Sequence, residues 1–154
     1  MKLVSLPMEK LVEMLLLQLE EGGVAPLTVT GNSMYPTFRH RRDTVTLVKG
    51  QPGKKDVILY KRDNGAYVLH RVVKAGAIYT CCGDNQWQPE PVRPDQVIAV
   101  VSGFVRKGKN YTVEHKGYRL WIWFWVGIFP VRRPILALRH GLGCLHRKIW
   151  RKQK

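Results

Sequence analysis

Seven short runs of β-branched and aromatic residues, separated by turn-forming residues, occupy most of the chain between residues 27 and 115. In order, they read LTVT, TVTLVK, DVILYKR, AYVLHRVV, AIYTCC, QVIAVVSGFV and YTVEH. Gly, Pro, Asn and Asp gather between them, and Asn64-Gly65 suits a two-residue type I′ hairpin turn. Strands this short, at such regular spacing, predict a mainly β fold built as an antiparallel sheet or small barrel.

The segment before these runs predicts a helix. Ser5 can cap it, Glu9 lies near the positive end of the helix dipole, and Gly22-Gly23 ends it. Its apolar residues recur at helical spacing, at Leu11, Val12, Leu15 and Leu19. Because charged residues interrupt the apolar stretch and no small-residue cleavage site follows, we expect no secretory signal and no N-terminal membrane anchor.

Positive charge is concentrated at the other end of the chain. The formal net charge is +15, and residues 116–154 contain no Asp or Glu. Their cations are Lys116, Arg119, Arg132, Arg133, Arg139, Arg147, Lys148, Arg151, Lys152 and Lys154. We expect one domain over 1–115, with its core at about 27–105, and a basic, helical extension over 116–154. A segment whose charged side chains are all positive indicates an anionic partner, but no nucleic-acid-binding motif accompanies it.

An aromatic run, LWIWFWVGIFPV, opens this extension, and its 12 residues are too few to span a bilayer as a helix. Two interpretations stay open: the run packs on the β core, or it anchors the protein peripherally at an anionic membrane. The second predicts a cytoplasmic protein at the inner membrane face. Its membrane contacts would be Trp121, Trp123, Trp125, Arg132 and Arg133.

The cysteines indicate neither a metal site nor a disulfide framework. There are three, Cys81, Cys82 and Cys144, with no CxxC spacing. Adjacent cysteines in a strand point to opposite faces, and a bridge between them would be strained. We therefore expect no metal, no cofactor and a reducing compartment.

The octapeptide GNSMYPTF, residues 31–38, contains a candidate nucleophile, Ser33. It follows a predicted strand, with Gly31 allowing a tight backbone path and Pro36 fixing the exit. A serine at such a corner can expose its hydroxyl beside its own N–H, which pairs an attacking oxygen with an oxyanion donor. The same residues also describe an ordinary polar turn, so the hypothesis needs a nearby base.

His70 is the best-placed histidine for that task. In the strand AYVLHRVV, alternation puts His70 on the same face as Val68 and Val72. A lone histidine on an apolar face is more often a packed core residue, so this placement does not decide its role. The alternative is a Ser–Lys arrangement, for which the candidates are Lys49, Lys61 and Lys74.

Four ordered motifs, GNSMYPTF, DVILY, VLHRVV and YTCCGDNQ, resemble the signal peptidase I and LexA-like serine peptidase superfamily. Gly-x-Ser-Met resembles the LexA-like branch. SMYPT followed by HRVV and GDN resembles the signal peptidases of the endoplasmic-reticulum type, which use a Ser–His pair. The resemblance covers residues 27–105 and implies a small antiparallel, barrel-like peptidase core. It also implies a serine endopeptidase that cuts a peptide or preprotein, such as a leader or signal peptide.

The resemblance implies a role for each matching residue. Ser33 would be the nucleophile, and His70 the general base and then the general acid. The acid that orients the histidine would be Glu90, in QPEP, or else Asp84, in GDNQ. Oxyanion and substrate contacts would come from Asn32, Met34 and Pro36.

Departures from the family pattern keep other functions open. KKDV stands where the family has a Gly-Asp pair, Gly31 replaces a helper hydroxyl, and we expect no N-terminal anchor. One alternative is a non-catalytic basic β protein that binds a membrane or nucleic acid. The other is a self-cleaving LexA-like regulator, although few residues precede Ser33 and EEGGVAPL lacks the expected Ala-Gly bond.

Overall fold

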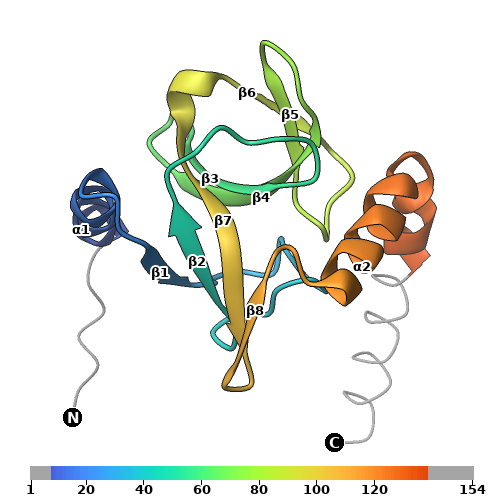
Figure 1. The fold of residues 1–154 in the computed structure, drawn as a ribbon. Coiled ribbons are helices and arrows are strands. Elements are labelled where there is room, and N and C mark those ends of the chain that lie inside the picture. The colour runs from blue at the N-terminus through green and yellow to red at the C-terminus, as the bar shows by residue number, and fades with distance from the viewer. Residues whose placement is uncertain (1–7, 139–154) are drawn as a thin grey trace, which may run out of the picture.

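The computed structural model describes residues 8–138, which form a curved β-sheet with helices on opposite sides (Figure 1). Helix α1 covers Met8–Glu20. The strands are β1 Ala25–Thr28, β2 Thr44–Val48, β3 Val57–Lys61, β4 Tyr67–Lys74, β5 Tyr79–Cys82, β6 Glu90–Val92, β7 Val97–Arg106 and β8 Lys109–Thr112. The other helical segments are η1 Pro94–Gln96, α2 Lys116–Gly127 and η2 Phe129–Val131, after which the chain stays helical to Leu138.

All eight strands belong to one antiparallel sheet, in the order β1-β2-β7-β3-β4-β5-β6, with β8 paired to β7. The register shifts between Thr46 and Leu47 in the β2–β7 ladder and between Leu59 and Tyr60 in the β3–β7 ladder. Such irregularities increase local twist, and the sheet curls into a half-barrel. The predicted mainly β, antiparallel fold is confirmed, as is the N-terminal helix; Ser5 lies outside the described residues.

The hairpin at Asn64-Gly65 is present, but its turn type differs from the prediction. Strands β3 and β4 pair from Val57 opposite Arg71 to Lys61 opposite Tyr67. Only Gly65 has a positive φ, +85°, whereas a type I′ turn needs two such residues. The Gly65 N–H bonds to the Arg62 carbonyl at 2.9 Å. The loop is therefore one residue longer than the predicted two-residue turn, and Gly65 is its last residue.

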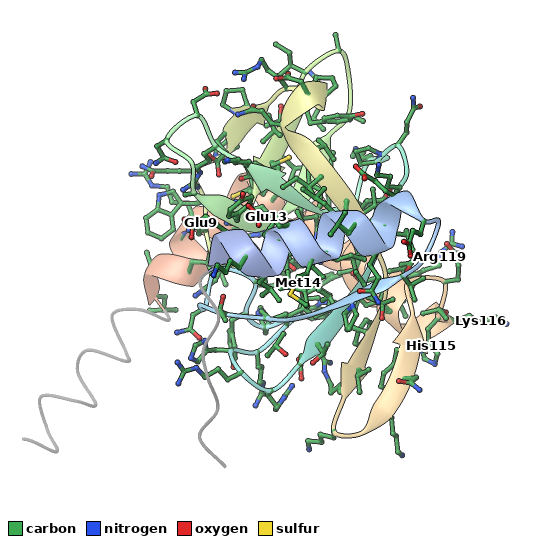
Figure 2. All side chains as sticks on the ribbon, turned by 90° about the vertical axis from the view of Figure 1, so that its left-hand side faces the viewer. Glu9, Glu13, Met14, His115, Lys116 and Arg119 are labelled. Carbon is green, nitrogen blue, oxygen red and sulfur yellow. The ribbon has the colours of Figure 1, made fainter. Side chains whose placement is uncertain are left out.

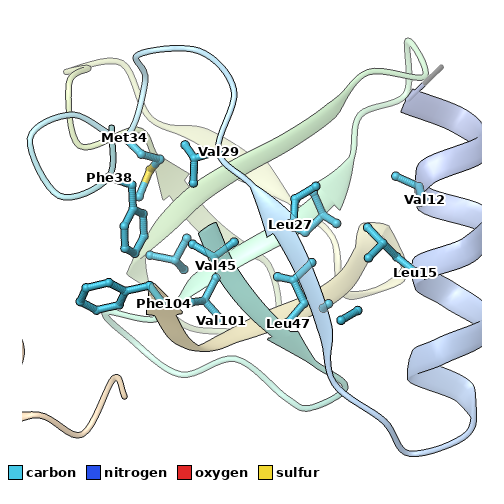
Figure 3. Close-up of a cluster of buried hydrophobic side chains, with 14 of the residues drawn as sticks. Val12, Leu15, Leu27, Val29, Met34, Phe38, Val45, Leu47, Val101 and Phe104 are labelled. Atoms are coloured by element: carbon cyan, nitrogen blue, oxygen red, sulfur yellow. The ribbon is translucent and has the colours of Figure 1, made fainter. Parts of the chain in front are cut away.

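Two clusters of buried side chains lie on opposite faces of β3. The first joins α1 to the sheet through Val12, Leu15 and Leu19, and includes Val57 and Leu59 (Figure 3). The second takes the alternate β3 residues and contains Ile58, Tyr60, Val72, Cys81, Val92 and Val100. Val68 packs against this second cluster, so the predicted alternation along β4 is confirmed.

The aromatic run of the extension forms helix α2, which packs on the β core along one side. Ile122, Trp125 and Val126 are buried there. Arg132 is also fully buried, with its guanidinium 4.8 Å from the Trp125 ring centroid and its Nη2 donating to the Trp125 carbonyl at 2.7 Å. The assignment of Trp125 and Arg132 to a membrane surface is therefore corrected, whereas Trp123 and Arg133 are exposed.

No single helix within residues 8–138 has the length and apolarity to cross a membrane. By those two criteria alone, only α2 taken together with Phe129–Leu138 reaches the threshold, and this pair is bent by 55°.

Candidate active site

Ser33 lies in the loop from β1 to β2, and buried neighbours fix its position. Met34 and Phe38 are in the core, and the Phe38 N–H bonds to the Met34 carbonyl at 2.8 Å. Gly31 has a φ of +81°, and its N–H donates to His40 Nδ1 at 2.8 Å. The loop is therefore held on both sides of Ser33, whose own side chain is partly exposed.

The GDN segment supports the backbone of this loop from outside. The Asn85 N–H donates to the Ser33 carbonyl at 2.7 Å, and Asn85 Nδ2 donates to the Asn32 carbonyl at 3.1 Å. A Cβ at Gly83 would lie 2.7 Å from the Ser33 carbonyl oxygen, closer than real Cβ contacts. Only glycine therefore allows this approach at position 83, while Asn85 supplies both hydrogen-bond donors. These two roles explain the glycine and the asparagine of the motif.

Asp84, between these two residues, pairs with Arg71 and not with His70. Arg71 Nε and Nη2 donate to the two Asp84 carboxylate oxygens at 2.9 and 2.7 Å. Both side chains are fully buried. Arg71 also donates to the Lys55 carbonyl at 2.7 Å, so the pair ties three segments together.

His70 makes its polar contacts through one ring nitrogen. It lies on β4 opposite Ile58, and Nδ1 is 3.1 Å from Tyr60 Oη and 3.2 Å from Glu90 Oε1. The Tyr60 hydroxyl donates its proton to Glu90 Oε1 at 2.5 Å. Nδ1 therefore faces two oxygen acceptors and carries the proton, which leaves a lone pair on Nε2.

The second ring nitrogen of His70 has no protein partner within residues 8–138. Among the side-chain nitrogens and oxygens of these residues, only Arg132 Nε is fully buried without a hydrogen-bond partner. Because His70 Nε2 also lacks a partner but is not fully buried, it contacts solvent. The ring as a whole is nearly buried, so its small accessible part includes Nε2. The lone pair is thus available to a group in the neighbouring pocket.

That pocket has a volume of about 250 Å³ and is lined by both Ser33 and His70. The curl of the sheet forms it, because β1 and its loop make one wall and β3–β4 the other. The remaining lining residues are Leu27, Thr28, Val29, Thr30, Met34, Leu59, Arg62, Tyr67, Val68, Leu69 and Gln86. Asn32 and Pro36 are not in this lining, and the structure records no hydrogen bond between the Ser33 hydroxyl and the His70 ring.

The lysine candidates lie elsewhere, since no lysine lines the Ser33–His70 pocket. Lys61 is exposed and lies over the Tyr67 ring, 5.3 Å from its centroid. Lys49 and Lys74 are exposed as well, and Lys74 lines a different groove. Among the described residues, His70 is therefore the base candidate that shares a pocket with Ser33.

Glu90 is held as a carboxylate by its neighbours. Arg62 grips it with two bonds, Nε to Oε2 at 2.8 Å and Nη2 to Oε1 at 2.6 Å. Burial opposes its ionisation, but the hydrogen bonds from Arg62 and Tyr60 outweigh burial and hold the pKa of Glu90 below its ordinary value. Burial also lowers the pKa of His70, although Glu90 partly offsets the effect. At neutral pH, a neutral imidazole therefore faces an ionised carboxylate.

Backbone donors are available beside Ser33. Within residues 8–138, the N–H groups of Ser33 and Met34 donate to no protein acceptor. Met34 as a whole is nearly buried, although it contributes to the pocket lining, so Ser33, which is partly exposed, has the more accessible of the two N–H groups. Free N–H groups next to a nucleophile are the donors that an oxyanion needs.

Sequence reasoning missed Tyr60 and Arg62, which complete the His70–Glu90 cluster. A signal for Tyr60 was present in the hairpin, because β3–β4 pairing puts it opposite Val68, on the face that carries His70. It also missed the contacts from α2. The Trp121 indole donates to Thr37 Oγ1 at 3.1 Å, and the Trp125 indole donates to the Asp84 carbonyl at 3.2 Å.

Arg132 adds a third contact from the extension. Its Nη1 approaches the Gly83 carbonyl at 3.5 Å, beside the Ser33 loop. The extension thus holds both loops that frame Ser33. Burial lowers the pKa of Arg132. The aromatic rings and carbonyl groups around its guanidinium, the Phe129 ring among them, replace the water that a guanidinium normally binds. No sequence signal marked this arginine as buried.

Comparison with known proteins gives no family assignment. No protein-family model matches the chain, and no curated protein matches it. No group of three or more His, Cys, Asp or Glu side chains within residues 8–138 could hold a metal ion.

Proposed function

We propose that this chain is a serine endopeptidase of the signal-peptidase type. The observation that carries the proposal is the asymmetry of His70: Nδ1 is bound to Tyr60 and Glu90, while Nε2 is left to the pocket lined by Ser33. Polar atoms of a nearly buried side chain normally have hydrogen-bond partners, so a ring nitrogen that faces a pocket without one is explained by a group that binds there. The half-barrel fold and the GDN loop behind Ser33 support assignment to the signal peptidase and LexA-like superfamily.

The reaction follows from these positions. His70 Nε2 takes the Ser33 proton as Oγ attacks the scissile carbonyl carbon, and the imidazolium is stabilised by Glu90. The Ser33 and Met34 N–H groups bind the oxyanion of the tetrahedral intermediate. His70 then protonates the leaving amine as the C–N bond breaks. A water molecule, deprotonated by His70, hydrolyses the acyl-enzyme and releases Ser33.

The lining of the pocket is mixed: apolar side chains such as Leu27, Val29 and Leu59 lie beside polar ones such as Thr28, Thr30 and Gln86. This mixture suits an extended peptide whose backbone meets the polar groups and whose small or apolar side chains meet the others. A leader or signal peptide fits this chemistry. A cytoplasmic location, with the enzyme at the inner membrane face, is part of the same proposal and is supported by the one-signed charge of residues 116–154.

Digestion of a peptide library tests the proposal. We expect wild-type protein to produce new internal cleavages, read by mass spectrometry, that Ser33→Ala protein does not produce. Ser102→Ala is the matched control, because Ser102 bonds to the Thr46 carbonyl away from the pocket. Cleavages that persist in purified Ser33→Ala protein would reject Ser33 as the nucleophile and favour a contaminating or different activity.

The charges around His70 predict opposite pH shifts for two variants. Wild-type kcat/KM should fall as pH drops through the pKa of His70, which lies below its ordinary 6.5. Glu90→Gln removes the anion that favours the imidazolium, so this acid limb should move to lower pH. Arg62→Gln removes a cation that disfavours the imidazolium, and the limb should move to higher pH. Identical acid limbs in all three proteins would contradict the assignment of His70 as the base.

A further inference from the structure

The outer sides of α2 and of the helical segment after it expose large apolar residues. Leu120, Trp123 and Phe124 are 68%, 65% and 51% exposed. Their spacing puts them on one side of α2, opposite the buried Ile122 and Trp125. The next segment repeats the pattern. We call the six exposed residues the apolar face: Leu120, Trp123, Phe124, Val131, Ile135 and Leu138.

A groove with a volume of about 750 Å³ adjoins this face. Trp123 and Phe124 form part of one wall, and Ile128 and Phe129 continue it. The other wall carries cations. They are Lys54, Lys55 and Lys74, and none of them makes an ion pair within residues 8–138.

The charge of the surroundings distinguishes this face from the exposed apolar residues of helix α1. Helix α1, on the opposite side of the molecule, exposes Met14 and Leu17, but its charged residues are three glutamates, Glu9 and Glu13 among them, and one lysine (Figures 1 and 2). From residue 116 onward the chain has no carboxylate side chain. An exposed patch that joins apolar side chains to unpaired lysines matches a surface with both phosphates and hydrocarbon.

We propose that the apolar face and the three groove lysines dock the protein on the surface of an anionic lipid bilayer. Trp123 and Phe124 enter the headgroup region, where aromatic side chains are favoured. Lys54, Lys55 and Lys74 bind lipid phosphates in the groove. The buried side of α2 contacts Thr37 and Asp84 at the same time, and no residue lines both this groove and the Ser33 pocket. Docking therefore leaves the pocket open.

Vesicle co-sedimentation of the full chain tests the proposal. The vesicles are phosphatidylcholine alone, or phosphatidylcholine mixed with phosphatidylglycerol, and the result expected is binding to the second kind only. Binding should weaken as salt is added. Trp123→Ser with Phe124→Ser should weaken it about tenfold or more, because two interfacial aromatic anchors are lost. Met14→Ser with Leu17→Ser is the matched control and should bind like wild type.

Charge is tested in the same assay. Lys54→Gln with Lys74→Gln should weaken binding about tenfold, whereas Lys107→Gln with Lys109→Gln, in the β7–β8 hairpin, should change it little. Three outcomes would overturn the proposal: no binding to anionic vesicles at low salt, equal binding by the Trp123/Phe124 variant, or a dimer in solution that this variant abolishes. The second would assign binding to residues 139–154, and the third would assign the face to a second copy of the chain. The membrane location belongs to the proposed function, but peptidase activity is measured separately, so docking and the proposed Ser33–His70 chemistry can fail independently.

Discussion

Alanine at Ser33 or at His70 is expected to lower kcat by about 10⁴-fold or more on a peptide that the wild type cleaves. Without Oγ there is no attacking atom, and without the imidazole the hydroxyl keeps its proton at neutral pH. Because the two side chains act in one step, the double variant should be little slower than either single variant. Ser102→Ala and His115→Ala, both outside the pocket, should stay active. Steady-state kinetics with one fluorogenic peptide compares the wild type with these five variants.

Two results would argue against His70 as the general base for Ser33. If His70→Ala kept full activity, the base would be another group, and Lys61 would be the first lysine to replace. If the effects of the two single variants multiplied in the double variant, Ser33 and His70 would act in different steps. Either result would remove the catalytic role that we propose for His70.

Breaking the Arg71–Asp84 pair is expected to cost stability and not chemistry. Asp84→Ala leaves a fully buried guanidinium without its carboxylate, and such losses typically cost about 3–5 kcal/mol in the free energy of unfolding. Urea denaturation measures the change. Asp63→Ala is the matched control, because Asp63 also pairs with an arginine, Arg93, but both are exposed, and no measurable change is expected.

Glu90→Ala should behave in the opposite way to Asp84→Ala. Glu90 is partly exposed and its loss frees Arg62 to meet water, so stability should change little while kcat falls. A variant of Asp84 that folded normally but lost activity would make Asp84 the acid that orients His70. The structure's contacts predict the reverse, since Glu90 and not Asp84 lies against the imidazole.

Local sequence signals predicted most of the sheet. The hairpin around Gly65 and the alternation of faces along β4 could both be predicted from the sequence. Turn-forming residues and the two-residue repeat of a strand each depend on only a few neighbouring residues. Strand β6, Glu90–Val92, was not predicted, since Pro91 and the nearby Pro89 and Pro94 indicate a turn. It occurs at the edge of the sheet, where Pro91 need not donate to a further strand. The edge position depends on the whole topology and cannot be read from the segment itself.

The candidate site was predictable only in part. The motifs led to Ser33, His70 and Glu90, and the structure brings the last two into contact and puts the first two on one pocket. The contacts from α2 could not be predicted, because Trp121 and Thr37 are 84 residues apart. Arginine is normally exposed, so the buried Arg132 also gave no signal. Its environment exists only once α2 has packed against the GDN loop.

The reactivity of the Ser33 hydroxyl shows directly whether His70 activates it, and measuring it requires no knowledge of the natural substrate. Folded wild-type and His70→Ala proteins are incubated with p-nitrophenyl acetate, and peptide mapping follows acetylation at residue 33 over time. We predict that wild-type Ser33 is acetylated about 10²–10⁴-fold faster than Ser33 in the His70→Ala protein, the usual contribution of a general base. Equal rates in the two proteins would show that His70 does not activate Ser33 and that the two residues are not a catalytic pair.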